Sequence, residues 1–332
     1  MLYYAREFFN VPYAIMITAS HCDNSYNGFK LCDEEGSMYE DKISNIYEII
    51  TRGEFKEGTG TIEPYDIFED YKSLMLKKIK IENPNLNLLV SCNNDATKNY
   101  YPEIIKDWGF NIYSDDNEKE ISFDENIERL EKKVIEINAD LGVLFDTDGD
   151  RLHIIDEKGK LVNNDSLMYV FYKSIEKTCK NKLAAFDVKC SRTLKEALES
   201  LGFKTMFNTT GYPFLKKCVN DYNLDFAGEF SGHFCFNDDF YGYDDALYAL
   251  GRLLKILTEN NVKLSELVPD FKDYVASKET YIEIDSNKID LVINKIRNYA
   301  KVKNYKLIEL DGVRIEYPDG FALIRKSNTT NK

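Results

Sequence analysis

The hydrophobic and polar positions along the chain predict strands and helices that alternate. Short apolar runs indicate strands at residues 13–17, 86–91, 141–145, 152–155, 182–188 and 205–208. Amphipathic stretches, with apolar side chains three or four positions apart, indicate helices at residues 1–9, 41–52, 66–81, 99–109, 124–139, 166–179, 191–201 and 245–260. Such alternation is typical of α/β layers with mostly parallel strands. A smaller unit then combines predicted strands with one helix, at residues 281–284, 306–310, 312–317, 321–324 and 288–300.

One acidic stretch interrupts this pattern between two apolar runs. It is Asp146-Thr147-Asp148-Gly149-Asp150-Arg151, which predicts a strand, a tight loop and a second strand. Alternate positions would point the three aspartates to one side of an extended loop. Their mutual repulsion calls for a positive partner, and Mg²⁺ is the divalent cation that prefers such oxygen ligands. A solvated acidic turn is the simpler alternative, and an EF-hand is excluded because the twelfth loop position lacks Glu.

Composition and charge narrow the class of protein. The 332 residues allow two or three domains, and a stretch with three glycines and one proline at residues 53–65 marks the first predicted boundary.

The net charge of −14 argues against a nucleic-acid or anionic-membrane partner. Seven scattered cysteines without a Cys-x-x-Cys motif predict reduced thiols and a cytoplasmic location. Neither an 18-residue apolar run nor a signal peptide is found, and the oligomeric state is not indicated.

Three further polar segments carry candidate chemistry. Residues 18–30 follow an apolar run and contain Ser20, a possible nucleophile beside His21, together with Lys30. Residues 228–233 place Glu229, Ser231 and His233 between and beside two glycines, as a catalytic or sugar-binding loop would. Residues 325–329 offer Arg, Lys, Ser, Asn and Thr as donors to a phosphate. Taken singly, each segment is also compatible with an ordinary turn, strand bulge or polar tail.

Together these segments resemble the α-D-phosphohexomutases of the phosphomannomutase/phosphoglucomutase type. Four motifs occur in that family's order. They are T-A-S-H-x-x-x-x-Y-N-G-x-K at residues 18–30, D-x-D-G-D-R at 146–151, G-E-x-S-G-H at 228–233 and R-x-S-N-T at 325–329. The segment at residues 187–192 is also similar to one in the family.

The resemblance implies an Mg²⁺-dependent enzyme with a multidomain α/β architecture. Helices would cover both faces of the sheets in the first three domains, and a smaller α+β domain would end the chain. The implied domains are residues 1–60 with the phosphoserine loop, 61–160 with the metal loop, 161–272 with the sugar loop and 273–332 with the phosphate loop.

The resemblance also implies a reaction and a role for each motif. Ser20 would carry a phosphoryl group and pass it to a mannose or glucose phosphate through a hexose 1,6-bisphosphate intermediate. The implied metal ligands are Ser20, Asp146, Asp148 and Asp150. The implied catalytic residues are Ser20, His21, Lys30, Arg151 and His233. The implied substrate-binding residues are Lys189, Arg192, Tyr212, Glu229, Ser231, His233, Arg325, Ser327, Asn328 and Thr329.

The chain departs from the family pattern in four places. Met1 lies only 19 positions before Ser20, so the family's opening strands and one active-site arginine are missing. The chain also stops soon after the R-x-S-N-T motif. Cys22-Asp23 replaces the common Asn-Pro, and Tyr212 stands where many members have His. A broken first sheet is expected to expose Tyr13, Ile15 and Ile17.

Three rival functions are compatible with the same residues. The first is a phosphoglucosamine mutase, which differs only in the sugar. The second is a phosphatase with Asp146 as the nucleophile. The third is a non-catalytic protein that binds phosphorylated sugars.

We predict that this partial chain turns over slowly or not at all, because part of the implied active site is missing. Steady-state assays with hexose 1-phosphates and 6-phosphates check this. Full mutase turnover would contradict it.

Overall fold

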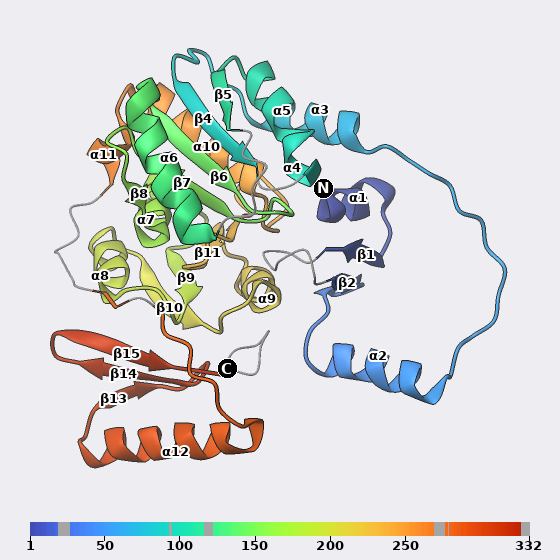
Figure 1. The fold of residues 1–332 in the computed structure, drawn as a ribbon, viewed down its shortest axis with the longest axis vertical. Helices are drawn as coiled ribbons and strands as arrows, with labels where there is room; N and C mark the ends of the chain where they lie inside the picture. Colours follow the sequence, from blue (N-terminus) through green and yellow to red (C-terminus); the bar gives the residue numbers. More distant parts are fainter. Residues whose placement is uncertain (19–26, 93–94, 116–121, 269–275, 278, 327–332) are drawn as a thin grey trace.

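A computed structural model describes residues 1–18, 27–92, 95–115, 122–268, 276–277 and 279–326. Four sheets follow one another along the chain, and each belongs to one unit (Figure 1). The architecture is multidomain α/β, with a small antiparallel sheet near the C-terminus. Within the described residues, no helix has the length and apolar character needed to cross a membrane.

The first unit contains a small antiparallel sheet of order β1-β2-β3. Its elements are α1 (Leu2–Phe9), β1 (Ala14–Ile17), β2 (Phe29–Asp33), β3 (Gly36–Ser37) and α2 (Asp41–Arg52). Ile17 pairs with Phe29 in the register of β1 and β2. As expected from sequence, Tyr13, Ile15 and Ile17 are exposed, at 65%, 64% and 68%. An extended, exposed segment then leads from α2 to the second unit (Figure 1).

The second unit contains a five-stranded sheet of order β5-β4-β6-β7-β8. Its elements are α3 (Phe68–Lys78), β4 (Asn87–Cys92), α4 (Asp95–Lys98), α5 (Tyr101–Asp107), β5 (Asn111–Asp115), α6 (Phe123–Ile137), β6 (Leu141–Phe145), β7 (Leu152–Ile155) and β8 (Leu161–Val162). β4 pairs in parallel with β5 and β6, whereas β6, β7 and β8 are antiparallel. Ser122 and Glu125 form a capping box that starts α6, which explains why this helix begins where its amphipathic pattern does.

The third unit contains a four-stranded sheet of order β10-β9-β11-β12, in which only β12 is antiparallel. Its elements are α7 (Asn164–Ile175), β9 (Leu183–Asp187), α8 (Arg192–Ser200), β10 (Lys204–Asn208), α9 (Tyr212–Tyr222), β11 (Phe226–Gly228), β12 (Phe234–Phe236), α10 (Ala246–Asn260) and α11 (Leu264–Leu267). The side chains of Asn163, Ser191 and Asp245 cap the starts of α7, α8 and α10.

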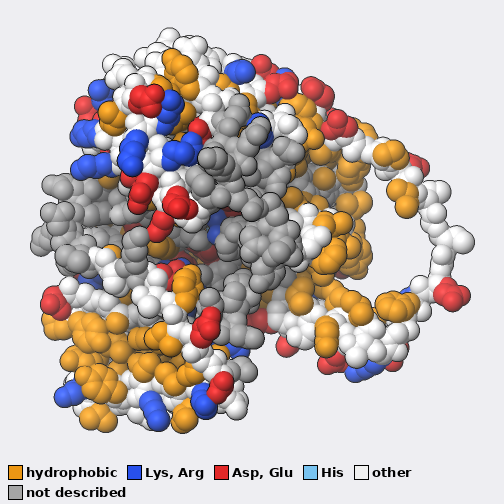
Figure 2. Space-filling view, in the orientation of Figure 1, with side chains coloured by type: hydrophobic (Ala, Val, Ile, Leu, Met, Phe, Trp, Pro, Cys, Tyr) orange, Lys and Arg blue, Asp and Glu red, His pale blue; other side chains and the backbone are white. Residues whose placement is uncertain are grey.

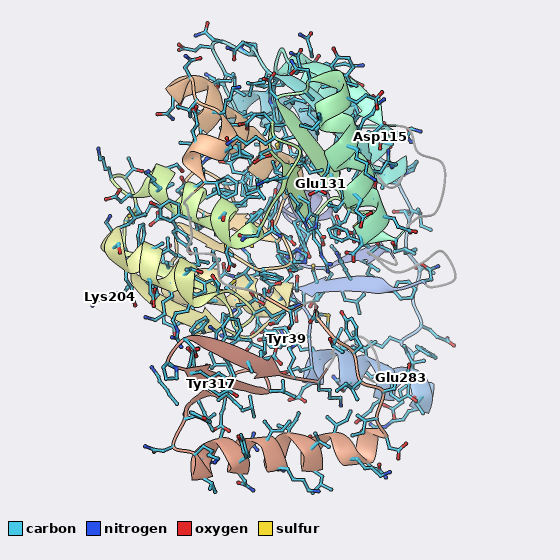
Figure 3. All side chains as sticks on the ribbon, turned by 60° about the vertical axis from the view of Figure 1, so that its left-hand side comes forward. Tyr39, Asp115, Glu131, Lys204, Glu283 and Tyr317 are labelled. Carbon is cyan, nitrogen blue, oxygen red and sulfur yellow. The ribbon has the colours of Figure 1, made fainter. Side chains whose placement is uncertain are left out.

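The fourth unit packs α12 (Ser286–Val302) against a three-stranded antiparallel sheet of β13 (Lys306–Ile308), β14 (Val313–Tyr317) and β15 (Gly320–Ile324). Figure 3 shows this unit beside the third, with Tyr317 on its sheet. Hydrophobic side chains gather over this unit in Figure 2. Leu291, Tyr299 and Val302 of α12 are exposed.

Three expectations about strands were wrong. Residues 281–284 form no strand. Six of the described strands were missed. Polar residues interrupt the apolar pattern of β2 and β5, and β3, β8, β11 and β12 have only two or three residues each, too few to show a period. The sheets are mixed rather than mostly parallel, since hairpin-like returns pair β7, β8 and β12 in the antiparallel sense.

The second and third units share one hydrophobic core. It extends from Val143 of β6 to Leu250 of α10 without a break. Gly251 makes this close approach possible, because a Cβ there would lie 2.7 Å from Ile79 and 3.0 Å from Trp108. Two units that share a core are expected to move as one body.

Two arginines attach the fourth unit to the third. Arg314 of β14 is fully buried and donates hydrogen bonds of 2.6 Å to the carbonyl oxygens of Val188 and Cys190. Its guanidinium lies over the rings of Phe207 and Phe321. These contacts cross the boundary between the units, so they are expected to stabilise the attachment.

Arg314→Met is predicted to weaken the fourth unit by about 3–5 kcal/mol, because it leaves the carbonyls of Val188 and Cys190 and the half-buried Glu316 carboxylate short of a donor. Hydrogen exchange of the amides in β13, β14 and β15 measures this. Arg297→Met is the matched control, since Arg297 makes an exposed ion pair with Glu309 and should cost less than about 1 kcal/mol. Equal effects of the two variants would contradict the prediction.

Candidate active site

The acidic loop is closed by its first aspartate. Asp146 follows β6, and its Oδ1 accepts hydrogen bonds from the backbone amides of Gly149, Asp150 and Arg151 at 3.0, 3.1 and 3.2 Å. The loop is therefore a tight turn between two strands, as the sequence predicted. A single carboxylate oxygen satisfies three amides that the turn would otherwise leave unpaired.

Gly149 is required at the tip of this turn. Its φ of 74° lies in the left-handed region, and a Cβ would lie 2.8 Å from Thr97 and clash with the Tyr101 hydroxyl. That hydroxyl donates a hydrogen bond of 3.1 Å to the Gly149 carbonyl. The turn is thus stabilised by Tyr101 of α5 as well as by the hydrogen bonds to Asp146.

The three aspartates converge. Carboxylate oxygens of Asp146, Asp148 and Asp150 lie within 4.8 Å of one another. Within the described residues, Asp146 Oδ2, Asp148 Oδ1 and Asp150 Oδ1 are buried without a hydrogen-bond partner. Burial, together with Asp150 and Asp148, raises the pKa of Asp146 well above its ordinary value. Oxygens in this state fit the ligand set of a hard divalent cation such as Mg²⁺.

Lys30 and Thr18 bring the first unit to this loop. Lys30 Nζ lies 2.8 Å from Asp148 Oδ2 and also contacts Asp150. Burial lowers the pKa of Lys30, but Asp150 and Asp148 outweigh it and raise the pKa above its ordinary value. The Thr18 hydroxyl donates to Asp148 Oδ2 at 3.1 Å. Residues on both sides of segment 19–26 are therefore anchored at the acidic loop. Ser20 and His21 lie outside the described residues.

Arg151, His233 and Asp244 form a chain of contacts that leads away from the loop. Arg151 Nε lies 3.7 Å from Asp146 Oδ2 and 3.0 Å from His233 Nε2. The other ring nitrogen of His233, Nδ1, lies 2.7 Å from Asp244 Oδ2.

The protonation state of His233 follows from these contacts. Burial and Arg151 lower the pKa of His233, whereas Asp150 and Asp244 raise it. Arg151 opposes a protonated ring, because two N–H groups would face each other across 3.0 Å. The hydrogen-bond geometry decides for a neutral ring with its proton on Nδ1.

The loop at residues 228–233 is organised around two buried carboxylates. Glu229 accepts hydrogen bonds from the Gly211 amide at 2.7 Å and the Ser231 hydroxyl at 3.0 Å. Burial raises the pKa of Glu229 to about 7. Asp187, at the end of β9, accepts from the Phe230 amide at 2.9 Å and from Thr210 at 3.0 Å.

Backbone contacts join this loop to the acidic loop. Leu152 N donates to Gly232 O at 3.2 Å, and Arg151 forms an isolated β-bridge with His233. The second and third units therefore meet at the site itself. Two segments about 80 residues apart in sequence are held as one structure.

Three other predicted substrate-binding residues already have partners in the protein. Lys189 pairs with Glu279 at 3.1 Å. Arg192 bonds the fourth unit, through Glu316 at 2.7 Å and the carbonyls of Tyr317, Pro318 and Gly320. Tyr212 is buried, and its ring centroid lies 5.2 Å from that of Tyr3 and 6.0 Å from that of His233.

The predicted phosphate loop is only partly described. Arg325 follows β15, and its Nε pairs with Asp311 at 2.8 Å. Ser327, Asn328 and Thr329 lie outside the described residues. Within the described part of the chain, no hydrogen bond or ion pair joins Arg325 to the acidic loop.

Sequence reasoning missed three residues of the site. Thr18 contacts Asp148, Asp187 organises the loop at 228–233, and Asp244 contacts His233. Asp187 carried a usable signal, because the carboxyl end of a central parallel strand is where α/β sheets place functional groups. Asp244 carried none beyond its position before a helix. The ring centroid of His153 in β7 lies 4.8 Å from that of Phe123, and burial lowers the pKa of His153 to about 3.

Comparison with known proteins decides the family. Profiles of alpha/beta/alpha domains I, II and III of phosphoglucomutase/phosphomannomutase match residues 1–57, 68–159 and 163–274. A phosphomannomutase/phosphoglucomutase of Pseudomonas aeruginosa is 30% identical, over 99% of this chain and 73% of that protein. The chain belongs to the phosphoglucomutase/phosphomannomutase family.

Two further relatives extend this result across the family. A phosphomannomutase of Methanocaldococcus jannaschii is 32% identical, over 95% of this chain and 72% of that protein. The crystal structure of a phosphoglucomutase/phosphomannomutase family protein from Burkholderia thailandensis has a TM-score of 0.86 and 31% identity, over 96% of this chain and 70% of that one. The resemblance inferred from four motifs is thereby confirmed, as is the multidomain α/β architecture.

Asp148→Asn is predicted to lower the affinity for Mg²⁺ and Mn²⁺ more than about tenfold, because it removes one charged ligand from the set. Calorimetric titration measures the affinity. Asp148 is preferable to Asp146 for this test, since Asp146 also folds the loop.

Asp156→Asn is the matched control for this variant. Asp156 closes the next acidic turn by accepting from the amides of Lys158 and Lys160 at 3.0 and 2.9 Å, and no described carboxylate cluster includes it. Its variant should bind the metal ions as the unmodified protein does. Equal affinities in all three proteins would place the metal elsewhere.

Proposed function

We propose that this protein transfers a phosphoryl group between Ser20 and a phosphorylated hexose. The reaction would interconvert hexose 6-phosphate and hexose 1-phosphate through a hexose 1,6-bisphosphate. One observation carries the proposal: Thr18 and Lys30, which flank segment 19–26, both contact the acidic loop. Covalent geometry keeps a residue two positions along the chain within about 7 Å of Thr18 Cα. The chain thus supports a nucleophile beside a cluster of metal-ligand oxygens.

Asp146, Asp148 and Asp150 are the residues that would hold Mg²⁺. When bound, Mg²⁺ would neutralise charge on the phosphoryl oxygens and so favour transfer. Support for this assignment comes from the three buried carboxylate oxygens that have no donor among the described residues. The Asp146 turn keeps them in place before any ligand arrives, which lowers the cost of organising the site.

Lys30 and Arg151 supply positive charge on two sides of the same loop. Lys30 stays protonated beside Asp148 and Asp150, so it suits stabilisation of a phosphate or donation of a proton. Arg151 is held at its Nε by His233, which leaves its two terminal nitrogens for anionic oxygens. Because both of its ring nitrogens are engaged, His233 acts here by orienting Arg151.

The remaining predicted residues would bind the sugar and its distal phosphate. Glu229 and Ser231 are linked to each other and could exchange that contact for sugar hydroxyls. The distal phosphate would be bound by donors at the end of the fourth unit, namely Arg325, Ser327, Asn328 and Thr329. Lys189, Arg192 and Tyr212 complete the substrate-binding proposal on the third unit.

The sugar is proposed to be mannose or glucose. The relatives from Pseudomonas aeruginosa and Methanocaldococcus jannaschii carry the names phosphomannomutase/phosphoglucomutase and phosphomannomutase. Glucosamine phosphate is the alternative substrate. Rates on the three hexose phosphates, measured side by side, distinguish these possibilities.

Ser20→Ala is predicted to lower phosphoryl transfer from hexose 1,6-bisphosphate at least about a thousandfold, because the nucleophile is lost. Single-turnover labelling followed by peptide mass spectrometry measures the transfer and locates the phosphate. Ser25→Ala is the matched control within the same segment and should keep the label on Ser20.

Other outcomes of this experiment identify the rival functions. Phosphate on Asp146 would indicate an aspartyl phosphatase. Calorimetric binding of hexose phosphate without any transfer would indicate a non-catalytic sugar-phosphate-binding protein. Either result would replace the proposed function.

A further inference from the structure

Asp244 is a buried carboxylate that none of the predicted motifs includes. Its side chain is fully buried, and its backbone forms an isolated β-bridge with Cys235. Oδ2 contacts His233, whereas Oδ1 has no hydrogen-bond partner among the described residues. A buried carboxylate with so few donors costs stability, so its presence calls for another reason.

The adjacent aspartate, Asp245, has a structural role. Asp245 caps α10 by accepting from the Tyr248 amide at 2.9 Å. It also accepts a hydrogen bond from the buried Tyr71 hydroxyl at 2.8 Å. Asp244 performs neither task. Its hydrogen bond goes to His233, and its carboxylate also lies within 4.8 Å of that of Asp150 in the acidic loop.

The contact with His233 selects one of two ring tautomers. A neutral imidazole carries its proton on only one nitrogen, and a carboxylate can face only the protonated one. Asp244 therefore favours the proton on Nδ1, and Nε2 is left as an acceptor for Arg151 Nε. In the other tautomer, an Nε2–H group would repel Arg151.

We propose that Asp244 is a positioning residue for phosphoryl transfer, which holds Arg151 beside the acidic loop by way of His233. The inference rests on the proposed function. Both ends of the chain of contacts are rigid, because Asp244 is fixed by its bridge to Cys235 and Arg151 by its bridge to His233. Nη1 and Nη2 of Arg151 make no hydrogen bond with any described residue, so this geometry presents them to phosphate oxygens.

The first test reads the tautomer directly in the metal-free protein. The chain has three histidines, so ¹⁵N-labelled imidazole nitrogens can be resolved by NMR at one fixed pH. We expect His233 to show a protonated Nδ1 and an unprotonated Nε2. In Asp244→Leu, which removes the acceptor at similar volume, Nδ1–H loses its partner. The fraction of rings with the proton on Nε2 should therefore rise, and those rings should lose the contact with Arg151 Nε. Asp244→Asn retains an acceptor oxygen and should keep the proton on Nδ1.

The second test measures phosphoryl transfer to Ser20 in single turnovers. Asp244→Leu should lower the maximal rate constant about 10- to 100-fold with little change in half-saturating substrate concentration, as loss of an outer partner of a ligand residue does. Asp244→Asn should recover most of the rate. Asp239→Asn, which removes an exposed carboxylate paired with Lys78, is the control and should leave the rate unchanged.

A double variant separates positioning from a merely structural role. Gln carries an amide oxygen as many bonds from Cα as Nε2 of His, so His233→Gln can accept from Arg151 without help from Asp244. In the His233→Gln background, Asp244→Leu should therefore lower the rate less than about twofold. A structural role predicts the same loss in both backgrounds. Circular dichroism confirms that each variant is folded.

Three results would overturn the proposal. They are an unchanged tautomer in Asp244→Leu, an unchanged transfer rate in that variant, and equal losses with and without His233→Gln. If the unmodified protein transfers no phosphate to Ser20, the proposed function fails first and the role of Asp244 in transfer fails with it. Transfer to Ser20 in the unmodified protein therefore distinguishes a failure of the proposed function from a failure of the proposed role of Asp244.

Discussion

The two oxygens of the Asp146 carboxylate have different tasks, and the site depends on this division. Oδ1 gathers the amides of Gly149, Asp150 and Arg151 and so folds the turn. Folding the turn brings the carboxylates of Asp148 and Asp150 to that of Asp146, against their mutual repulsion. Oδ2 stays buried and unpaired within the described residues, facing the same centre. The free energy of the backbone hydrogen bonds thereby holds together charges that a cation would otherwise have to assemble.

The site lies where the second and third units act as one body. A shared core, close helix packing at Gly251 and the backbone contact of Leu152 with Gly232 hold the acidic loop against the loop at residues 228–233. The first unit joins this body at the site through polar contacts of Lys30 and Thr18 with Asp148, and the fourth joins it through Arg192 and Arg314. The acidic loop and the loop at residues 228–233 therefore form one fixed centre to which the first and fourth units are attached.

Positive charge is local in this acidic protein. The net charge is −14, yet Lys30 pairs with Asp148 and Asp150, and Arg151 lies 3.7 Å from Asp146. The partners of Lys30 and Arg151 are the carboxylates that would ligate a divalent cation. The two side chains therefore balance the negative charge of these carboxylates when no cation is bound. Long-range repulsion between an acidic surface and a phosphorylated sugar is screened within about 8–10 Å at physiological salt. Recognition of the proposed substrate would therefore depend on short-range contacts, such as those with these two cations.

The sequence by itself determined most elements and the family. Local periodicity and capping residues suffice for helices such as α6 and α10, and four spaced motifs suffice for the resemblance. Tertiary structure decided the partners. Strand β5 and the antiparallel returns of β7, β8 and β12 depend on neighbouring strands, which a local pattern does not contain. Likewise, Asp148 meets Thr18 across 130 positions, and Arg151 meets His233 across 82. Side-chain type sets which contacts are chemically allowed, whereas packing of distant segments selects the few that form.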